Sequence, residues 1–151
     1  MSDTLKILCR NTGHYLDIEG GENLLQLADK IGHKNLGLHF PPICAMVNNK
    51  NEGLRYKVFG PKIVQYLDRS SAAGFRVYTR SLCMMLYCAV RRMLPGATLR
   101  IEHSIAGGWY CRLFTPPTEG QPASPASITD ALLQQLQSAM TQLRDADLPF
   151  D

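Results

Sequence analysis

The sequence lacks any apolar run of about 18 residues or more, the length typical of a membrane-spanning helix. It also lacks a charged-then-apolar N-terminal leader, which a secretory signal peptide needs. We therefore expect no membrane span and no signal peptide, and a cytoplasmic location. The 5 cysteines include no Cys-x-x-Cys pair, so reduced thiols are expected rather than a redox motif or a zinc site of that type.

A second missing pattern is Gly-x-x-x-x-Gly-Lys-Ser/Thr, in which backbone amides and a lysine hold nucleotide phosphates. We expect no nucleoside triphosphate site in these residues. The chain also has little excess of one charge over the other, because 16 basic and 13 acidic residues leave a net charge of +3. That balance alone supports a nucleic-acid partner only weakly. The 151 residues, 45% of them apolar, suffice for one domain or two small ones.

Alternating apolar residues and turn signals predict a first unit made of a small sheet and one helix. The expected strands and helix, in chain order, are Leu5–Arg10, His14–Glu19, Leu24–Ile31 (helical), Ile43–Asn48, Leu54–Phe59 and Ile63–Leu67. A small sheet with one helix across it is a β-grasp arrangement. Small polar residues from Asp68 to Gly74 predict a boundary, which divides the chain into domains 1–68 and 69–151.

The second domain is predicted to be a two-layer helix–hairpin–helix unit, so the expected fold class is α+β. Its elements are helix Gly74–Leu94, strands Thr98–His103 and Trp109–Phe114, and helix Ile128–Arg144, which Ser127 can cap. The long helix should bury one apolar face: Phe75, Tyr78, Leu82, Met85, Leu86, Ala89, Val90 and Met93. Residues 115–127, rich in proline, are expected to form an exposed loop.

The opposite face of that helix carries Arg76, Arg80, Tyr87 and Arg91 at helical spacing. Guanidinium groups beside an aromatic ring suit phosphates and stacked bases. A solvated face that keeps the domain soluble explains the same pattern. The spacing alone leaves both interpretations open.

The first unit resembles a TGS domain, the small β-grasp module at the N-terminus of threonyl-tRNA synthetases. The resemblance over residues 5–67 is carried by the hairpin, by Gly-Gly-Glu-Asn-Leu-Leu-Gln-Leu-Ala at 20–28, by Ala-Met-Val-Asn-Asn at 45–49, and by Asp68 after the closing strand. Residues 70–151 resemble the first part of the second N-terminal domain of these synthetases, which is related to an editing domain. The matching segments are 74–90, Pro95, Gly-Trp-Tyr at 108–110, and Asp-Leu-Pro-Phe at 147–150.

One departure from that family concerns its chemistry. The family's editing helix carries His-Ser-x-x-His, two histidines one turn apart that suit metal binding or catalysis. Arg80 and Met84 stand at those two positions here, and the family's later Cys-x-x-x-His pair is absent. Arginine is neither a metal ligand nor a base at neutral pH. We therefore expect no catalytic residues, no bound metal and no deacylase activity in this chain.

The segments at 8–13, 80–83 and 100–103 resemble a related group, bacterial nucleoside kinases of the uridine kinase type that carry this synthetase-like region. That resemblance implies a non-catalytic ligand-binding or regulatory region for RNA or a nucleotide-like ligand. Its partner would be a C-terminal kinase-like domain of the same chain, to which ATP and magnesium would belong. Two alternatives remain: an editing-type aminoacyl-tRNA domain of a threonyl-tRNA synthetase relative, or a protein-interaction or dimerisation module.

The resemblance places the helix face in a ligand cleft, and Arg80 is the first candidate because it replaces a functional histidine. The full set of ligand- or RNA-binding candidates is Arg76, Arg80, Met84, Tyr87, Arg91, His103 and Tyr110. His103 and Cys111 lie on the two hairpin strands and could meet a metal with Cys83. No strong ligand spacing supports that metal site.

Overall fold

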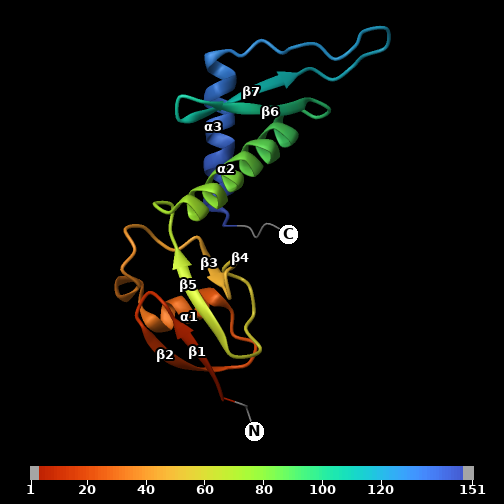
Figure 1. The fold of residues 1–151 in the computed structure, drawn as a ribbon. Coiled ribbons are helices and arrows are strands. Elements are labelled where there is room, and N and C mark those ends of the chain that lie inside the picture. Colours follow the sequence, from red (N-terminus) through yellow and green to blue (C-terminus); the bar gives the residue numbers. More distant parts are fainter. Residues whose placement is uncertain (1–3, 148–151) are drawn as a thin grey trace. The chain divides into compact units, whose positions relative to one another are not determined.

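The computed structural model of the chain describes residues 4–147. The chain divides into two compact units, Met1–Thr79 and Arg80–Asp151, and the division falls within one long helix. Both units contain helices and strands (Figure 1), which confirms a mixed α+β protein. The β-grasp arrangement and the boundary at 68/69 stay predictions. Of the segment at 147–150 that resembles the synthetases, residues 148–150 lie outside the described residues.

The first unit is built on a five-stranded sheet in the order β2-β1-β5-β3-β4. β1 runs antiparallel to β2 and parallel to β5, and β3 runs antiparallel to both β4 and β5. The elements are β1 Thr4–Cys9, β2 His14–Glu19, α1 Leu24–Ile31, a short 3-10 helix His33–Leu36, β3 Cys44–Val47, β4 Lys50–Glu52 and β5 Lys62–Leu67. Asn23 caps α1 as part of a capping box with Gln26, so the start of this helix follows from local sequence.

The predicted strand Leu54–Phe59 is wrong. Its backbone instead hydrogen-bonds to the turn before α1: the Val58 amide donates to the Glu22 carbonyl at 2.9 Å, and the Gly21 amide donates to the Val58 carbonyl at 2.8 Å. The sheet takes β4 in its place, in a segment between two of the expected strands. Asn48 and Asn49 have φ of 49° and 68°, and this pair of positive angles makes the two-residue turn between β3 and β4.

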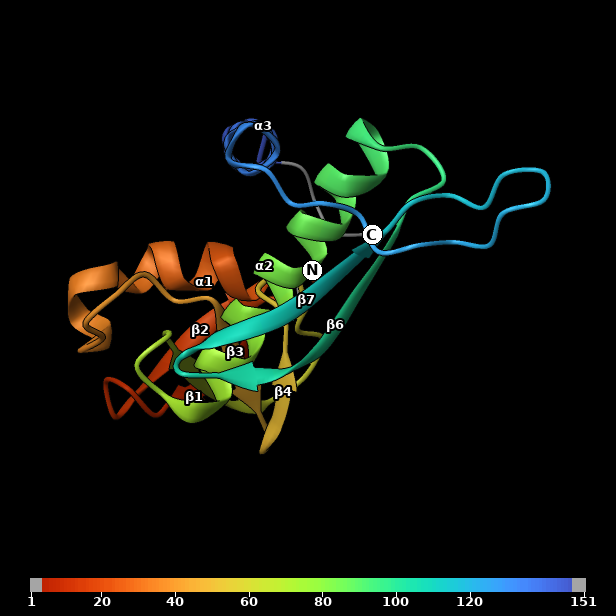
Figure 2. The same ribbon diagram turned by 90° about the horizontal axis from the view of Figure 1, so that it is seen from above.

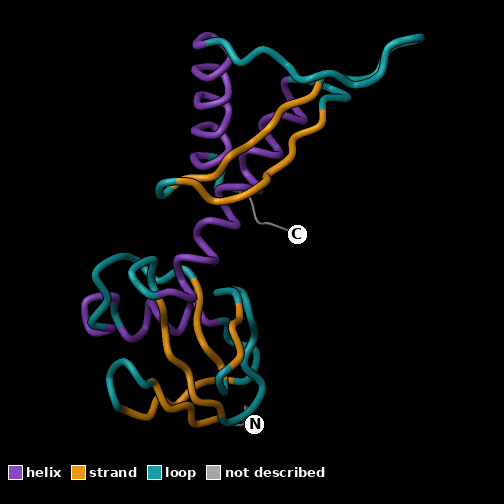
Figure 3. Tube along the Cα trace, turned by 45° about the horizontal axis from the view of Figure 1, so that its top comes forward, coloured by secondary structure: helices purple, strands orange, loops and turns teal. Residues whose placement is uncertain are grey.

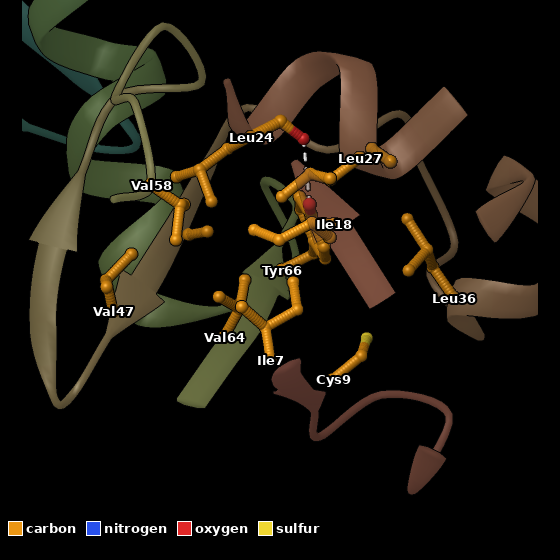
Figure 4. Close-up of a cluster of buried hydrophobic side chains, with 12 residues drawn as sticks. Ile7, Cys9, Ile18, Leu24, Leu27, Leu36, Val47, Val58, Val64 and Tyr66 are labelled. Carbon is orange, nitrogen blue, oxygen red and sulfur yellow. Dashed lines mark hydrogen bonds between the residues drawn. The ribbon is translucent and has the colours of Figure 1, made fainter. Parts of the chain in front are cut away.

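The core of the first unit packs apolar side chains of α1 against one face of the sheet (Figure 4). Ile7, Leu24, Leu27 and Val64 are fully buried there. Tyr66 is also fully buried, and its hydroxyl donates to the Leu24 carbonyl at 2.7 Å. That bond ties β5 to the first turn of α1.

Tyr66→Phe is expected to lower the free energy of unfolding of this unit by about 1–2 kcal/mol, because the Leu24 carbonyl loses a buried donor. Tyr15→Phe is the matched control, since Tyr15 is 69% exposed and should change stability by less than about 0.5 kcal/mol. Urea unfolding followed by amide resonances of β1 and β5 measures both. Equal effects of the two substitutions would contradict a stabilising role for the hydrogen bond from the Tyr66 hydroxyl to the Leu24 carbonyl.

The second unit pairs a hairpin with helices (Figure 3). Its elements are β6 Thr98–Ile105, β7 Gly108–Phe114, α3 Asp130–Asp145 and the end of α2 Ala72–Met93. Their common core is small, with Ala89, Val90, Leu113 and Leu136 buried. The loop between β7 and α3 runs out beyond the hairpin (Figure 2), and its residues are almost all exposed, as predicted.

Three expectations for the helices are wrong. Phe75 and Leu82 belong to the predicted buried face of α2 but are 55% and 37% exposed. Among its described residues the second unit has only four buried ones, too few to cover Leu82, and Phe75 lies in the first unit, whose core cluster does not include it. Thr129, not Ser127, caps α3, and its hydroxyl accepts from the Leu132 amide at 3.2 Å. Within the described part of the chain, no helix is long and apolar enough to span a membrane.

Candidate nucleic-acid interface

Four of the candidate residues on α2 lie in the second unit and form one exposed stripe: Arg80, Met84, Tyr87 and Arg91. At about 100° per residue, they fall within roughly 40° of the direction of Arg80. Arg91 donates from Nη1 to the Tyr87 hydroxyl at 3.3 Å, and its guanidinium carbon lies 5.8 Å from the centre of the Tyr87 ring. We call these four residues the α2 stripe.

Arg76, the fifth helical candidate, is also exposed, but it belongs to the first unit. It is therefore not part of the α2 stripe. Its side chain is on the same helix, one turn before Arg80.

The hairpin brings the other two candidates together. His103 is opposite Tyr110 in the register of β6 and β7, and their ring centres are 5.4 Å apart. A β-bulge between Ile101 and His103 shifts the register and puts His103 on the side where Tyr110 lies. Tyr110 is 46% exposed, so the ring pair is open to solvent.

Sequence reasoning missed four residues beside this pair. Arg100 is directly opposite Arg112, and their guanidinium carbons lie 5.0 Å and 4.8 Å from the centre of the Phe114 ring. The alternation Tyr-x-Arg-x-Phe at 110–114 is a signal that could have found Arg112 and Phe114, because alternate residues of a strand share a face. Glu102 lies 3.8 Å from Arg112. We call the set Arg100, Glu102, His103, Tyr110, Arg112 and Phe114 the outer face of the hairpin.

The other face of the hairpin turns toward the core of the unit, where Leu113 is buried. Cys111 lies on that face, while His103 lies on the outer face, so the suggested metal site of Cys83, His103 and Cys111 is not assembled. Burial raises the pKa of the Cys111 thiol and the nearby Cys83 raises it further, which disfavours the thiolate that binds metals. Among residues 4–147, no three His, Cys, Asp or Glu side chains lie close enough together to hold a metal ion.

The α2 stripe supplies binding groups and contains neither a histidine nor a carboxylate. Arg80 and Arg91 are permanently charged at neutral pH, and Met84 has only a weakly accepting thioether. Such side chains can hold phosphates and contact the faces of bases. They cannot activate water.

Comparison with known proteins finds similarity to threonine–tRNA ligases. The chain is 28% identical over 130 residues to a threonine–tRNA ligase of Desulforamulus reducens, an alignment that covers 86% of this chain and 19% of that protein. It is also 28% identical over 98 residues to threonine–tRNA ligases of Clostridium perfringens, which covers 65% of this chain and 15% of theirs. The chain thus spans less than a fifth of the length of these relatives. No protein-family model matches it.

Proposed function

We propose that this chain is a tRNA-binding region related to threonine–tRNA ligase, made of a TGS-like first domain and an editing-type second domain that does not hydrolyse its ligand. The observation that carries the proposal is the 28% identity to a threonine–tRNA ligase over 86% of the chain. Because the chain is so much shorter than that relative, we propose RNA binding and not the ligase reaction.

The α2 stripe supports the binding part of the proposal. Two guanidinium groups on one exposed helix face can contact the phosphates of an RNA strand, and Tyr87 and Met84 offer surfaces against which a base can lie. The contact between Arg91 and Tyr87 fixes one of these cations beside its aromatic partner. We expect Arg80 to contact the end of the RNA directly, because the resemblance puts a functional residue at its position.

The same residues support the absence of hydrolysis. A pair of histidines one turn apart could act as bases or hold a metal, but Arg80 and Met84 can do neither. The proposed role is therefore to hold a tRNA end without attacking its ester.

The nucleoside kinase interpretation stays a prediction about sequence outside these residues. The relatives named above are threonine–tRNA ligases and lend it no support. ATP and magnesium would be bound by the kinase domain of such a protein and not by this region. A P-loop motif in the parent gene after residue 151 would favour the kinase interpretation over the synthetase one.

Binding of a labelled threonine-specific tRNA tests the proposal. Arg80→Ala is expected to weaken binding by roughly tenfold, the effect of removing one charge-assisted hydrogen bond to a phosphate. Arg92→Ala is the matched control, since Arg92 is exposed on the same helix about 120° away from Arg80. Equal losses from the two substitutions would show that only net charge matters and would contradict the α2 stripe as the site.

A further inference from the structure

The outer face of the hairpin contains two arginines, Arg100 and Arg112, that lie directly opposite each other on the paired strands β6 and β7. Like charges opposite each other destabilise a strand pair. Each guanidinium group nevertheless lies within 5.0 Å of the centre of the Phe114 ring, so both lie on the same side of the hairpin. A bound anion would relieve that repulsion.

The charge of the outer face is only partly compensated. Glu102 lies 3.8 Å from Arg112, and both side chains are partly exposed. This one carboxylate balances one of the two guanidinium groups, which leaves a positive charge for an outside ligand. The ligand that fits is therefore anionic.

The aromatic pair of Tyr110 and His103 lies beside the two arginines on the same face of the hairpin. Tyr110 is two residues from Arg112 on β7, a separation of about 7 Å at the rise of an antiparallel strand. One nucleotide can bridge that span, with its phosphate at the arginines and its base at the rings. Tyr110 and His103 present flat, exposed surfaces on which a base can stack.

We propose that the outer face of the hairpin is a second RNA-binding surface that takes a single-stranded segment. Arg100 and Arg112 hold a phosphate between them, and Tyr110 with His103 stacks the neighbouring base. This inference rests on the proposed function, because it takes RNA as the ligand, and it adds a surface distinct from the α2 stripe.

Two observations favour single-stranded RNA over an acidic peptide or a duplex. A peptide carboxylate would satisfy the arginines but leave the exposed ring pair unused, whereas a nucleotide uses both. A duplex keeps its bases stacked on each other and offers none to Tyr110. Within the described residues β6 and β7 form a two-stranded ribbon, which Pro125 joins only by an isolated bridge to Phe114, so the ribbon is narrow and a single strand can follow it.

The test measures binding of a fluorescent oligouridine of about 12 nucleotides to the full chain at several salt concentrations. The double substitution Arg100→Gln with Arg112→Gln should weaken binding at least about tenfold. It should also flatten the dependence of log Kd on log salt by about 0.7 for each phosphate that the variant no longer neutralises. The matched control is Arg92→Gln with Arg144→Gln, which removes the same charge elsewhere on the second unit and should preserve most of the affinity.

Stacking is tested separately from charge. Tyr110→Leu should weaken oligouridine binding by roughly fivefold, and Tyr110→Phe should restore it, since the ring and not the hydroxyl does the stacking. Amide chemical shifts of the unsubstituted chain should move at β6 and β7 when oligouridine is added. Because it uses the unsubstituted chain, that measurement shows whether RNA binds at the hairpin even if a substitution unfolds the hairpin.

Three outcomes would overturn the inference. Shifts confined to α2 would place the RNA elsewhere, and so would equal losses from the hairpin and control double substitutions. Equal affinity for a polyglutamate peptide or for duplex RNA would show that the face selects only charge. If hairpin substitutions have no effect while Arg80→Ala still weakens tRNA binding, the second surface fails and the proposed function stands. If the chain binds no RNA at all, both fail.

Discussion

Gly74→Ala is expected to lower the free energy of unfolding of the first unit by on the order of 3 kcal/mol or more. A Cβ at this position would lie 1.8 Å from the Asp68 carbonyl oxygen and 2.7 Å from its carbon. Both are backbone atoms, so the substitution forces the first turn of α2 or the end of β5 to move. This loss outweighs the gain of about 0.5–1 kcal/mol that alanine normally brings to a helix interior.

Gly53→Ala provides the control for Gly74→Ala. No atom lies within 4 Å of a Cβ at Gly53, and its backbone is not in the left-handed region. The two variants should therefore differ in the urea midpoint of the first unit, read from amide resonances of β1 and β5. Equal midpoints would mean that the backbone of Gly74 does not lie as close to the Asp68 carbonyl group as the structure indicates.

Asp68→Ala is the second large prediction, with an expected loss of about 2–4 kcal/mol in the free energy of unfolding of the first unit. The Asp68 side chain is only 1% exposed. Its carboxylate accepts from the Phe40 amide at 3.0 Å and from the Ser70 amide at 2.8 Å, and also from the Ser70 hydroxyl. Alanine leaves these donors without their acceptor, whereas Asp68→Asn keeps one oxygen and should lose less. Asp17→Ala, at an exposed position on β2, is the surface control.

The same contacts make the stability of the first unit depend on pH. The Ser70 hydroxyl, with the Phe40 and Ser70 amides, lowers the pKa of Asp68 to about 2 even though burial opposes that shift. A carboxyl with a lowered pKa stabilises the folded state above its unfolded pKa of about 3.9. That contribution is lost as the pH falls through about 2.

Urea unfolding at a series of pH values checks this linkage. The unsubstituted chain should lose stability between about pH 4 and pH 2, and Asp68→Asn should lose less over that interval because its amide does not titrate. Parallel curves for the two proteins would contradict the role given to the Asp68 carboxylate.

The elements with strong local signals were predictable from the sequence. The first hairpin, α1 with its Asn-x-x-Gln capping box, and α2 ending before Pro95 all have local causes. The segment 54–59 was misassigned because its partners, Gly21 and Glu22, lie about 35 residues earlier and nothing local signals that pairing. Burial on α2 was overestimated because periodicity finds an apolar face but not the size of the core that receives it.

The candidate site was predictable from the sequence only where its residues have a local signal. Helical spacing found Arg80, Tyr87 and Arg91, and the resemblance added Met84; all four side chains of the α2 stripe are exposed in the structure. The bulge between Ile101 and His103 decides which strand residues share a face, and no sequence pattern announced it. Arg100 and Arg112 therefore escaped notice, since their pairing depends on the register of the hairpin.

We propose above that this chain holds a tRNA end without hydrolysing it. Incubation with a mischarged threonine-specific tRNA, labelled on the amino acid, follows the complex and the ester together in one time course. We predict a salt-sensitive complex in which the ester decays no faster than it does in buffer. Ester loss accelerated by the chain, or no complex even at low salt, would contradict the account.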